Sequence, residues 1–556
     1  MYLVLTRSSR GVDALRLGDD GSAVAPAEPV AERDFPAWVA RVERERPRWV
    51  WDDTTRWYPS LLDAGVRVDR CVDLRLSHQL LRGSTLTATS SLANAPAGPW
   101  DHATPLAQKV ETHGALFDLD DDPAADAAVD PVAEFAAQRD AIASAAEPGR
   151  ISLLLAAESA GALIASEIKF AGLPWHADVH ERLLADLLGD RPRGAERPAR
   201  LEELLERMRA ILGTADVNPD SPAELLKALR RTGLQVTSTR SWQLRDVKHP
   251  VIEPLLEYKK LSRLQTANGW NWLDTWIADG RFRPDYVPGG TATGRWGASG
   301  GGALQLPKQI RGAVIADPGW KLVVADAGQL EPRILTALSA DRAMADAGRG
   351  DLYEGIVASG AVSTRAEAKV AMLGAMYGAT AGDGGRLMPA LTRAFPRAIA
   401  VVEAAARVGE RGGIVTTQLG RSSPPPGESW REVQESASVP GASDALQRAA
   451  RGQSRSWGRF TRNFIVQGTA AEWALCWMAG LRGRLWDLAD GRITDRPHLV
   501  FFLHDEVIVH TPAELAGEVV AQLNAAASEA GRLVFGQMPV RFPITTAVVD
   551  DYGQAK

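Results

Sequence analysis

Apolar and polar residues alternate along the first 30 residues, which predicts strands and turns. Residues 49–51 (Trp-Val-Trp) predict another short strand, and a short helix is expected over 58–64. A third apolar run at 72–74 leads into an expected helix over 77–81. Strands that alternate with helices are typical of a small α/β domain. Residues 84–134 are rich in Ser, Thr, Ala, Pro and Asp, which predicts a loop or linker.

Helical periodicity begins after this linker and dominates the next part of the chain. It predicts helices over 151–170, 180–188, 201–212, 223–230 and 250–276. Ser221 is expected to cap the fourth of these, with Pro222 in its first position. Lys259, Lys260 and Arg263 lie along the flank of the last helix, where a solvated face explains them as well as a ligand does.

Four further patterns follow in the C-terminal half. A buried strand is expected to end on Asp326, and a helix begins after Thr364, which forms a capping box with Glu367. Residues 420–443, rich in Pro and Ser, predict a loop before a long helix that begins near residue 444. Trp473, Leu475 and Trp477 in that helix are expected in a core.

The segment 498–510 carries two apolar, β-branched and aromatic runs around His504-Asp505-Glu506, which predicts a hairpin. Adjacent acids between buried strands repel each other and lose water. A hard divalent cation would offset that cost, because Mg²⁺ takes carboxylate oxygens and keeps waters or phosphates as its other ligands. The triplet alone is equally typical of a solvated acidic turn.

Two helix faces carry candidate nucleotide chemistry. Behind the capping box, two cations, an aliphatic and an aromatic residue recur every four positions: Arg365, Lys369, Leu373 and Tyr377. Such a face suits a polyphosphate and a nucleobase, although a solvated amphipathic helix has the same pattern. On the later long helix, polar residues that suit base edges or sugars also lie four apart: Arg459, Asn463 and Gln467.

Asp326 and Asp505 each lie at a strand boundary beside one of these helices. Asp326 alone could be no more than a helix N-cap. A pair of such acids is what two-metal phosphoryl transfer needs, with ions about 3.5–4 Å apart that activate the attacking oxygen and hold the leaving phosphate.

Composition narrows the class of protein. A chain of 556 residues is expected to form several domains. The balance of 63 Lys and Arg against 69 Asp and Glu excludes a uniformly basic protein but not a local basic channel. Only Cys71 and Cys476 occur, which excludes a disulfide framework and a CxxC metal motif. No signal peptide and no run of about 20 apolar residues is found, so we expect an intracellular protein that does not span a membrane.

The motifs together resemble the family-A DNA polymerases, the group of bacterial DNA polymerase I. Residues 326–333 (Asp-Ala-Gly-Gln-Leu-Glu-Pro-Arg) are similar to the first palm motif, 365–378 to the fingers helix, and 504–506 to the third motif. Other stretches resemble template, primer and thumb–palm segments: 258–264, 293–295, 304–305 and 467–471. All occur in the order of the family, over roughly 150–556.

The resemblance implies an α/β and α+β multidomain fold. An exonuclease-like α/β domain over 1–149 would precede a right-hand polymerase domain over 150–556. That domain would contain a helical thumb, a palm with an antiparallel sheet, and helical fingers, over about 180–280, 281–350 with 451–556, and 351–450. The 5′-nuclease domain of full-length DNA polymerase I is expected to be absent.

The resemblance also implies roles for single residues. Asp326 and Asp505 would hold two Mg²⁺ ions, for which Mn²⁺ could substitute, with Glu506 as a supporting catalytic acid. The incoming deoxynucleoside triphosphate would contact Gln329, Glu331, Arg365, Lys369, Leu373 and Tyr377. The primed DNA template would contact Arg263, Arg295, Gln305, Arg459, Asn463, Gln467 and His504. The primer 3′-OH would attack the α-phosphate and release pyrophosphate, and Glu331 would refuse a ribose 2′-OH, unlike the small residue of single-subunit RNA polymerases.

Several positions depart from the family pattern. Ala327 and Gly328 replace a usual Tyr and Ser, and Pro332 replaces Leu. Leu373 stands where most members have Phe or Tyr, and the remaining departures are Tyr353 for His and Ala303 for Asn. We therefore expect a working polymerase with unusual fidelity or nucleotide affinity.

Near its N-terminus the chain lacks the Asp-x-Glu that proofreading needs on the first strand, and offers there only residues 19–20 and 52–53 as paired acids. We expect an exonuclease-like fold without proofreading. The alternatives are the same polymerase with an active 3′–5′ exonuclease, or a non-catalytic primer–template binding protein. The expected setting is DNA repair or replication by a cytoplasmic, nucleoid-associated monomer.

Overall fold

The computed structural model describes residues 1–556 except 10, 103–128, 195, 215, 246, 301, 303–305, 379–381 and 556, and the side chains of Trp242 and Asp383. Gln305, expected to contact DNA, therefore lies outside the described residues. The chain divides into two compact units, each made of separate segments. The first unit comprises Met1–Ala171, Tyr286–Ser299 and Val323–Ala547; the second comprises Gly172–Asp285, Gly300–Leu322 and Val548–Lys556.

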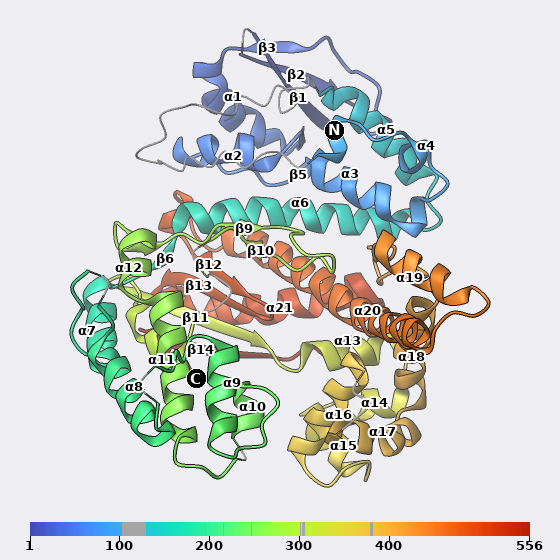
Figure 1. The fold of residues 1–556 in the computed structure, drawn as a ribbon. Coiled ribbons are helices and arrows are strands. Elements are labelled where there is room, and N and C mark those ends of the chain that lie inside the picture. Colours follow the sequence, from blue (N-terminus) through green and yellow to red (C-terminus); the bar gives the residue numbers. More distant parts are fainter. Residues whose placement is uncertain are drawn as a thin grey trace, which may run out of the picture. The chain divides into compact units, whose positions relative to one another are not determined.

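The first unit begins with a five-stranded sheet, as the alternation predicts (Figure 1). Its strands are β1 Tyr2–Ser8, β2 Gly11–Leu17, β3 Glu28–Val30, β4 Arg48–Trp51 and β5 Cys71–Asp73. They lie in the order β3-β2-β1-β4-β5, with β1 antiparallel to β2 and parallel to β4. Val4 is opposite Leu15 and Val50, so apolar residues of neighbouring strands share a face.

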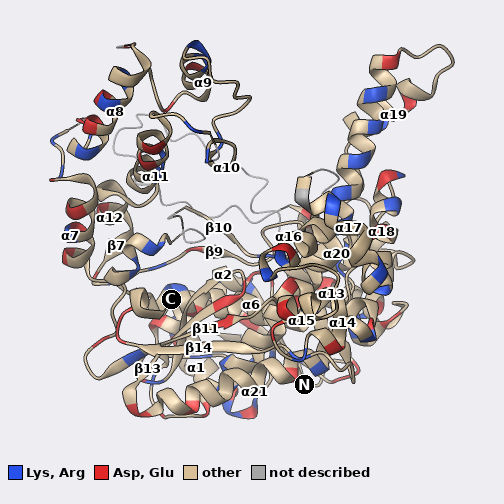
Figure 2. Cartoon of the chain, turned by 90° about the horizontal axis from the view of Figure 1, so that it is seen from below, with Lys and Arg blue, Asp and Glu red and all other residues tan. Residues whose placement is uncertain are grey.

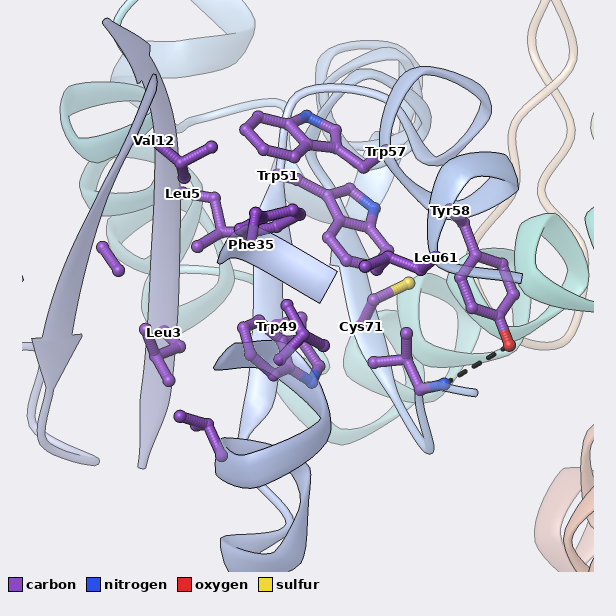
Figure 3. Packing of buried hydrophobic residues seen from close by; sticks show 14 of the residues in the cluster. Leu3, Leu5, Val12, Phe35, Trp49, Trp51, Trp57, Tyr58, Leu61 and Cys71 are labelled. Carbon is purple, nitrogen blue, oxygen red and sulfur yellow. Dashed lines mark hydrogen bonds between the residues drawn. The ribbon is translucent and has the colours of Figure 1, made fainter. Parts of the chain in front are cut away.

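Alternate side chains of this sheet enter two separate cores. One face packs against α1 (Phe35–Val42) and α2 (Thr54–Asp63), and Figure 3 shows this core, which includes Leu3, Leu5, Trp49, Trp51, Trp57 and Tyr58. The opposite face packs against α3 (Leu74–Gly83) and α5 (Pro131–Ala143) through Val4, Val50, Leu74 and Phe135. Helix α2 begins four residues before the predicted start at 58, because the Asp53 carboxylate accepts the Thr55 N–H at 2.9 Å and caps it.

The predicted linker 84–134 is wrong in part. It contains the short helix α4 (Ser91–Asn94), whose cap is Ser90, and the start of α5, which Asp130 caps. Most of the remaining stretch, 103–128, lies outside the described residues.

Helix α6 (Pro148–Ala171) follows, close to the predicted bounds. By length and composition alone this helix could cross a membrane. No such helix was expected from the sequence, because polar residues interrupt its apolar positions. In the structure, however, 72% of its most apolar window is buried inside the protein, as in the core helices of soluble proteins. No other helix among the described residues passes this test.

The second unit is mainly helical. Its helices are α7 Ala177–Leu188, α8 Ala199–Leu212, α9 Pro222–Arg231, α10 Ser241–Leu244, α11 Ile252–Asn268 and α12 Trp270–Trp276. Ser221 caps α9 as predicted. The strands β6 (Leu173–Pro174), β7 (Ile277–Ala278) and β8 (Arg281–Phe282) form a small sheet in the order β6-β8-β7. Trp175, His180, Trp272 and Phe282 pack in one aromatic cluster beside it.

A four-stranded sheet in the order β12-β13-β11-β14 carries the predicted acids. Its strands are β11 Trp320–Ala327, β12 His498–Leu503, β13 Glu506–Pro512 and β14 Ile544–Val549. The predicted hairpin is confirmed, since β12 and β13 pair antiparallel on either side of residues 504–505. The short pair β9 (Tyr286–Val287) and β10 (Gly297–Ala298) belongs to the same unit.

Helices make up most of the remaining first unit (Figure 1). They are α13 Leu330–Ser339, α14 Arg342–Ala347, α15 Leu352–Ala358, α16 Arg365–Tyr377, α17 Gly382–Ala394, α18 Pro396–Glu410, α19 Glu428–Ser438, α20 Asp444–Trp486 and α21 Ala516–Phe535. Helix α19 corrects the predicted loop 420–443. The core prediction is confirmed, because Trp473, Leu475 and Trp477 are buried. Both cysteines are free and buried.

Candidate polymerase active site

Two adjacent strands bring Asp326 and Asp505 to the same edge of the sheet. Asp326 lies near the end of β11, and Asp505 lies in the turn between β12 and β13. The two segments are in direct contact there, since the Ala327 N–H donates to the Asp505 carbonyl oxygen at 2.9 Å. Both acids are half-buried, whereas Glu506 is 3% exposed in β13. Asp326 and Asp505 are 179 positions apart in the sequence but are neighbours in the fold.

The hairpin that carries Asp505 is fixed from β9. The Tyr286 hydroxyl donates to the Phe502 carbonyl oxygen at 2.6 Å and accepts the Phe502 N–H at 3.1 Å. Burial raises the pKa of Tyr286, so it remains a donor. At the turn, His504 has a φ of 58°, a left-handed conformation that non-glycine residues adopt rarely and that is often found at functional sites. Neither feature was foreseen from the sequence.

Four of the expected nucleotide and DNA contacts form one cluster near this turn. Glu331, in the first turn of α13, accepts a hydrogen bond from the Arg295 guanidinium and another from the Tyr377 hydroxyl, the latter at 3.1 Å. His504 is close enough for its charge to be affected by both Arg295 and Glu331. Residues from β9–β10, α13, α16 and the hairpin turn thus converge on one carboxylate.

The electrostatics of the cluster set its protonation. Burial raises the pKa of Tyr377 to about 12, and the Glu331 carboxylate adds to this effect, so the hydroxyl is a donor at neutral pH. Burial lowers the pKa of His504, and the positive charge of Arg295 lowers it further, so the imidazole is neutral at pH 7. The cluster therefore contains a fixed carboxylate with cationic and neutral donors around it.

Helix α16 has the predicted capping box and the predicted face. The Thr364 hydroxyl accepts the Glu367 N–H at 3.1 Å, and the Glu367 carboxylate accepts the Thr364 N–H at 3.2 Å. The four residues of the predicted face, Arg365, Lys369, Leu373 and Tyr377, are exposed, whereas Ala368, Ala371, Met372, Ala375 and Met376 on the other side are buried. Lys369 forms no ion pair with any residue that the structure describes. One cation of this face is thus open to a ligand.

Arg365 is held by acids of the preceding helix. Its guanidinium donates to one oxygen of Asp351 at 2.8 and 3.3 Å, lies 3.8 Å from a Glu354 carboxylate oxygen, and stacks over the Tyr353 ring at 5.4 Å. The hydrogen bond from Arg365 lowers the pKa of Asp351 although its partial burial opposes this. The sequence showed only a departure from the family pattern here, Tyr353 in place of His; the structure adds that Asp351 is the partner of the expected phosphate-binding arginine.

Gln329 points into the protein in this structure. Its amide oxygen accepts the Leu352 N–H at 2.9 Å and an Arg333 N–H at 3.2 Å. Arg333 also donates to four carbonyl oxygens around it, those of Gly328, Gly348, Gly350 and Arg541. Gln329 and the buried Arg333 therefore join α13 to the start of α15, a positioning role that the motif alone did not indicate.

The predicted polar face of α20 lies beside the 291–295 loop. Thr293 donates to the Gln467 amide oxygen at 3.0 Å. Asn463 is half-buried, and its amide oxygen has no hydrogen-bond partner among the described residues. Arg459 is exposed and packs so closely on Gly378, at the end of α16, that a Cβ there would lie 2.8 Å from its Cγ. Gly378 also has a φ of 73°, which glycine adopts readily.

One further expected DNA contact lies in a different compact unit from this cluster. Arg263 is exposed on α11, in the second compact unit. Within the part of the chain that the structure describes, no group of three or more His, Cys, Asp and Glu side chains is arranged to hold a metal ion. The candidate metal ligands are therefore the two aspartates at the sheet edge, with other ligands left to water or phosphate.

The paired acids of the N-terminal sheet have structural partners. Asp52 accepts from Arg56 at 2.8 Å and from the Trp57 indole, and Asp53 caps α2. Asp73 is buried and accepts from the Thr54 backbone and hydroxyl, both at 2.8 Å. Burial raises the pKa of Asp73 to about 7, and the nearby charge of Asp53 adds to this.

The sequence of the chain matches a known protein family over most of its length. The family model described as DNA polymerase family A matches residues 193–553, which is more than half of the chain. The chain belongs to DNA polymerase family A. Among characterised relatives, the thermostable DNA polymerase I of Thermus thermophilus is 26% identical over 355 residues, and that of Thermus aquaticus is 27% identical over 352. Each match covers 57% of this chain and 38% of the relative, so the chain spans well under half of the length of these proteins.

A solved structure supports the fold over the whole chain. It is the polymerase domain of Pol1 from M. smegmatis in complex with DNA primer-template and dNTP. The TM-score is 0.68 at 17% sequence identity, and the alignment covers 100% of this chain and 95% of that one. The expected multidomain α/β and right-hand polymerase fold is thereby confirmed.

Proposed function

We propose that this protein is a DNA-directed DNA polymerase, which adds deoxynucleotides to a primer 3′-OH and releases pyrophosphate. The observation that carries the proposal is the contact of the β11 end with the β12–β13 turn. This contact places Asp326 beside Asp505, and the Arg295–Glu331–Tyr377–His504 cluster lies in the same compact unit.

Family-A DNA polymerases generally use divalent metal ions. The two half-buried aspartates fit Mg²⁺, a hard cation that prefers carboxylate oxygens and retains waters or phosphate oxygens. Asp326 and Asp505 would hold two ions, Mn²⁺ could replace Mg²⁺, and the buried Glu506 would add negative charge behind them. When bound, the metal would activate the 3′-OH and neutralise charge on the leaving pyrophosphate.

The chain itself would position the nucleotide. Lys369 and Arg365 would bind the triphosphate as a point charge and as a bidentate donor. Leu373 would pack on the base and sugar, and Tyr377 would cover the templating position. Glu331, fixed between Arg295 and Tyr377, would leave no room for a ribose 2′-OH. Gln329 would support the site through α15.

The primer–template duplex would lie along Arg295, Asn463, Gln467 and His504, with Arg459, Arg263 and Gln305 as further contacts. The exposed Leu373, in place of a larger aromatic residue, would bury less area against the nucleotide. We therefore propose that nucleotide affinity or fidelity is altered, which steady-state incorporation of correct and incorrect nucleotides on a primed template will measure.

Primer extension tests the central proposal. We expect Asp326→Ala and Asp505→Ala each to abolish extension of a primed template, because each removes a proposed metal ligand. Asp490→Ala, which removes an exposed acid from the loop after α20, is the matched control and should leave extension unchanged. Extension by Asp505→Ala at the wild-type rate would refute the mechanism, and DNA binding without any extension by the wild type would favour a non-catalytic binding protein.

We further propose that the N-terminal domain (about 1–149) does not proofread. The support is that Asp52, Asp53 and Asp73 serve as ion-pair partner and helix caps. A primer with a mismatched 3′ end should therefore persist in Mg²⁺ without nucleotides. Degradation that disappears in Asp53→Ala would show that an exonuclease survives.

The proposed setting is DNA repair or replication by a monomer in the cytoplasm, associated with the nucleoid through DNA. Light scattering on the purified chain, with and without primed DNA, tests the monomer; a mass that doubles with concentration would contradict it.

A further inference from the structure

Four arginines follow one face of the N-terminal part of α20. They are three or four positions apart, at Arg448, Arg451, Arg455 and Arg459. At 3.6 residues per turn they lie within an arc of about 80° and extend over about 16 Å of the helix. We call these residues the arginine stripe. Figure 2 shows Lys and Arg in blue along α20, whereas α19 carries the single basic residue Arg431.

The arginine stripe has no counter-charge within the described chain. All four side chains are exposed, and none forms an ion pair or hydrogen bond with a described residue. Helix α19, which packs on this part of α20 through Gln434 and the Ala450 carbonyl oxygen, carries acids, but they do not pair with the stripe. The nearby Arg462, by contrast, is buried in an ion pair with Glu403 of α18.

A purely structural role does not explain this arrangement. Like charges three or four positions apart repel each other and destabilise a helix by about 0.2–0.5 kcal/mol per pair. A solvated helix face ordinarily mixes both signs, which relieves this repulsion. Arginine also presents a planar fork that matches two phosphate oxygens, which lysine does not. The stripe is therefore complementary to a polyanion with a phosphate backbone.

The arginine stripe is continuous with the candidate active site. Arg459 packs on Gly378, directly after Tyr377 of α16. Beyond it along α20 come Asn463, whose buried amide oxygen has no hydrogen-bond partner among the described residues, and Gln467, which Thr293 contacts. A nucleic acid strand at Gln467 and Tyr377 could thus continue along the stripe without leaving the helix.

The direction of the arginine stripe indicates which strand it fits. The C-terminal half of α20 packs into the palm core, where Trp477 donates to the Leu523 carbonyl oxygen of α21 at 3.1 Å. The N-terminal part packs instead on α18 and α19, through contacts such as Thr461 with the Ala405 carbonyl oxygen. The stripe therefore runs from Tyr377 away from the sheet that carries Asp326 and Asp505. Product duplex would lie on the side of the acids, and uncopied template on the other.

We propose that Arg448, Arg451 and Arg455 bind the phosphate backbone of the unpaired template strand ahead of the templating position. This rests on the proposed polymerase function, from which the templating position at Tyr377 is taken. The stripe reads no sequence, because arginine–phosphate contacts position a strand without distinguishing its bases.

The test is a binding measurement without nucleotide or metal. The triple variant Arg448→Ala/Arg451→Ala/Arg455→Ala leaves Arg459 in place. The control Arg41→Ala/Arg44→Ala/Arg532→Ala removes the same charge from exposed arginines that also lack ion pairs within the described chain. Fluorescence anisotropy is measured on a primer–template whose template overhang is one nucleotide or about 15 nucleotides.

On the long overhang we expect the stripe variant to bind roughly 10- to 100-fold more weakly at 0.1 M salt, with a salt slope smaller by about 2. On the one-nucleotide overhang it should bind as the wild type does, and the control should match the wild type on both. The triple Arg→Lys variant keeps the charge but not the planar fork, and should recover only part of the affinity. Circular dichroism of each variant shows whether α20 remains folded.

Three results would overturn the proposal. An equal loss on both overhangs would place the stripe on the duplex, and no loss on either would exclude a DNA contact. A loss that the control shares would reflect net charge alone. Failure of the proposed function is distinguishable, because the wild type would then bind primed DNA but not extend it, whereas the overhang dependence is read without catalysis.

Discussion

Asp351 is the partner of Arg365, the arginine that we propose binds the nucleotide. Because its carboxylate accepts two hydrogen bonds from that guanidinium, a triphosphate must replace this partner before Arg365 can bind phosphate. Asp351 also caps α15 through the Glu354 N–H at 3.0 Å, and asparagine preserves such a cap. We expect Asp351→Asn to lower KM for the nucleotide about two- to fivefold with little change in kcat, because an exposed ion pair is only a weak competitor. Single-nucleotide incorporation at varied nucleotide concentration measures both constants.

Glu354→Gln is the matched control for this competition. The Glu354 carboxylate lies 3.8 Å from the Arg365 guanidinium, beyond hydrogen-bond distance, so the effect of this substitution on KM should be smaller. A KM that rises in Asp351→Asn would mean that Asp351 aligns Arg365 for the triphosphate rather than withholding it.

Residue types could be predicted from the sequence better than residue partners. The α16 face followed from a spacing of four along one helix, and the structure exposes all four of its residues. The bond between Arg365 and Asp351 joins residues 14 positions apart and depends on how α15 packs on α16. Gln329 shows the same limit, because its motif position does not reveal that its amide is turned toward Leu352.

At the scale of the element, the capping box should decide how well α16 presents its cations. Thr364→Ala removes one acceptor from the first turn, which carries Arg365, and caps of this kind contribute about 1 kcal/mol. We expect fraying of that turn to raise KM for the nucleotide about two- to fivefold. The comparison is steady-state incorporation by Thr364→Ala and by Thr364→Ser, which keeps the hydroxyl and should behave as the wild type. Equal KM values for all three proteins would contradict a role of the cap.

Two elements show why the boundaries could not all be predicted. The periodic segment 250–276 is two helices, because Gly269 breaks it; a Cβ there would lie 2.3 Å from the Gln265 carbonyl oxygen. Apolar spacing continues on both sides of that glycine and hides the break. Helix α19 fully buries none of its residues and has only Trp430, Val433 and Ala437 as spaced apolar positions, so it was hidden next to the Pro- and Ser-rich residues before it. Its hydrogen bonds with α20 join Gln434 to the Ala450 carbonyl oxygen and to Ser454.

At the scale of the whole first unit, Arg482 of α20 joins the N-terminal sheet domain to the helical core. It donates to both Glu167 carboxylate oxygens of α6, at 2.6 and 2.9 Å, and to the carbonyl oxygens of Val68 and Asp69. We expect Arg482→Met to destabilise the protein by about 3–5 kcal/mol, because Glu167 is left buried without its main partner. Calorimetry should then show the N-terminal domain unfolding in a separate, earlier transition.

The double variant Arg482→Met/Glu167→Gln is the control for this buried pair. It removes both charges and should recover part of the lost stability. A single unfolding transition in both variants would show that other contacts suffice to couple the domain.

The buried acid Glu472 should make the free energy of unfolding depend on pH. Burial raises its pKa to about 7, although bonds from Thr417 and from the Leu419 N–H, the latter at 2.9 Å, oppose the shift. Between its ordinary pKa near 4.5 and pH 7, the folded chain therefore holds a proton that the unfolded chain has lost. Stability from this group falls as pH rises through that window. His180, whose pKa burial lowers to about 4, acts in the opposite direction below pH 6.5.

A comparison of variants separates the contribution of Glu472 from that of His180 and of other titrating groups. Glu472→Gln cannot ionise, so relative to the wild type it should gain on the order of 1–3 kcal/mol of unfolding free energy between pH 5 and pH 8. The exposed Glu514→Gln serves as control and should follow the wild type at every pH. Urea unfolding at several pH values gives the difference directly. Parallel curves for Glu472→Gln and wild type would mean that Glu472 is already ionised in the fold at pH 5, with Thr417, Leu419 and the charge of Arg421 outweighing its burial.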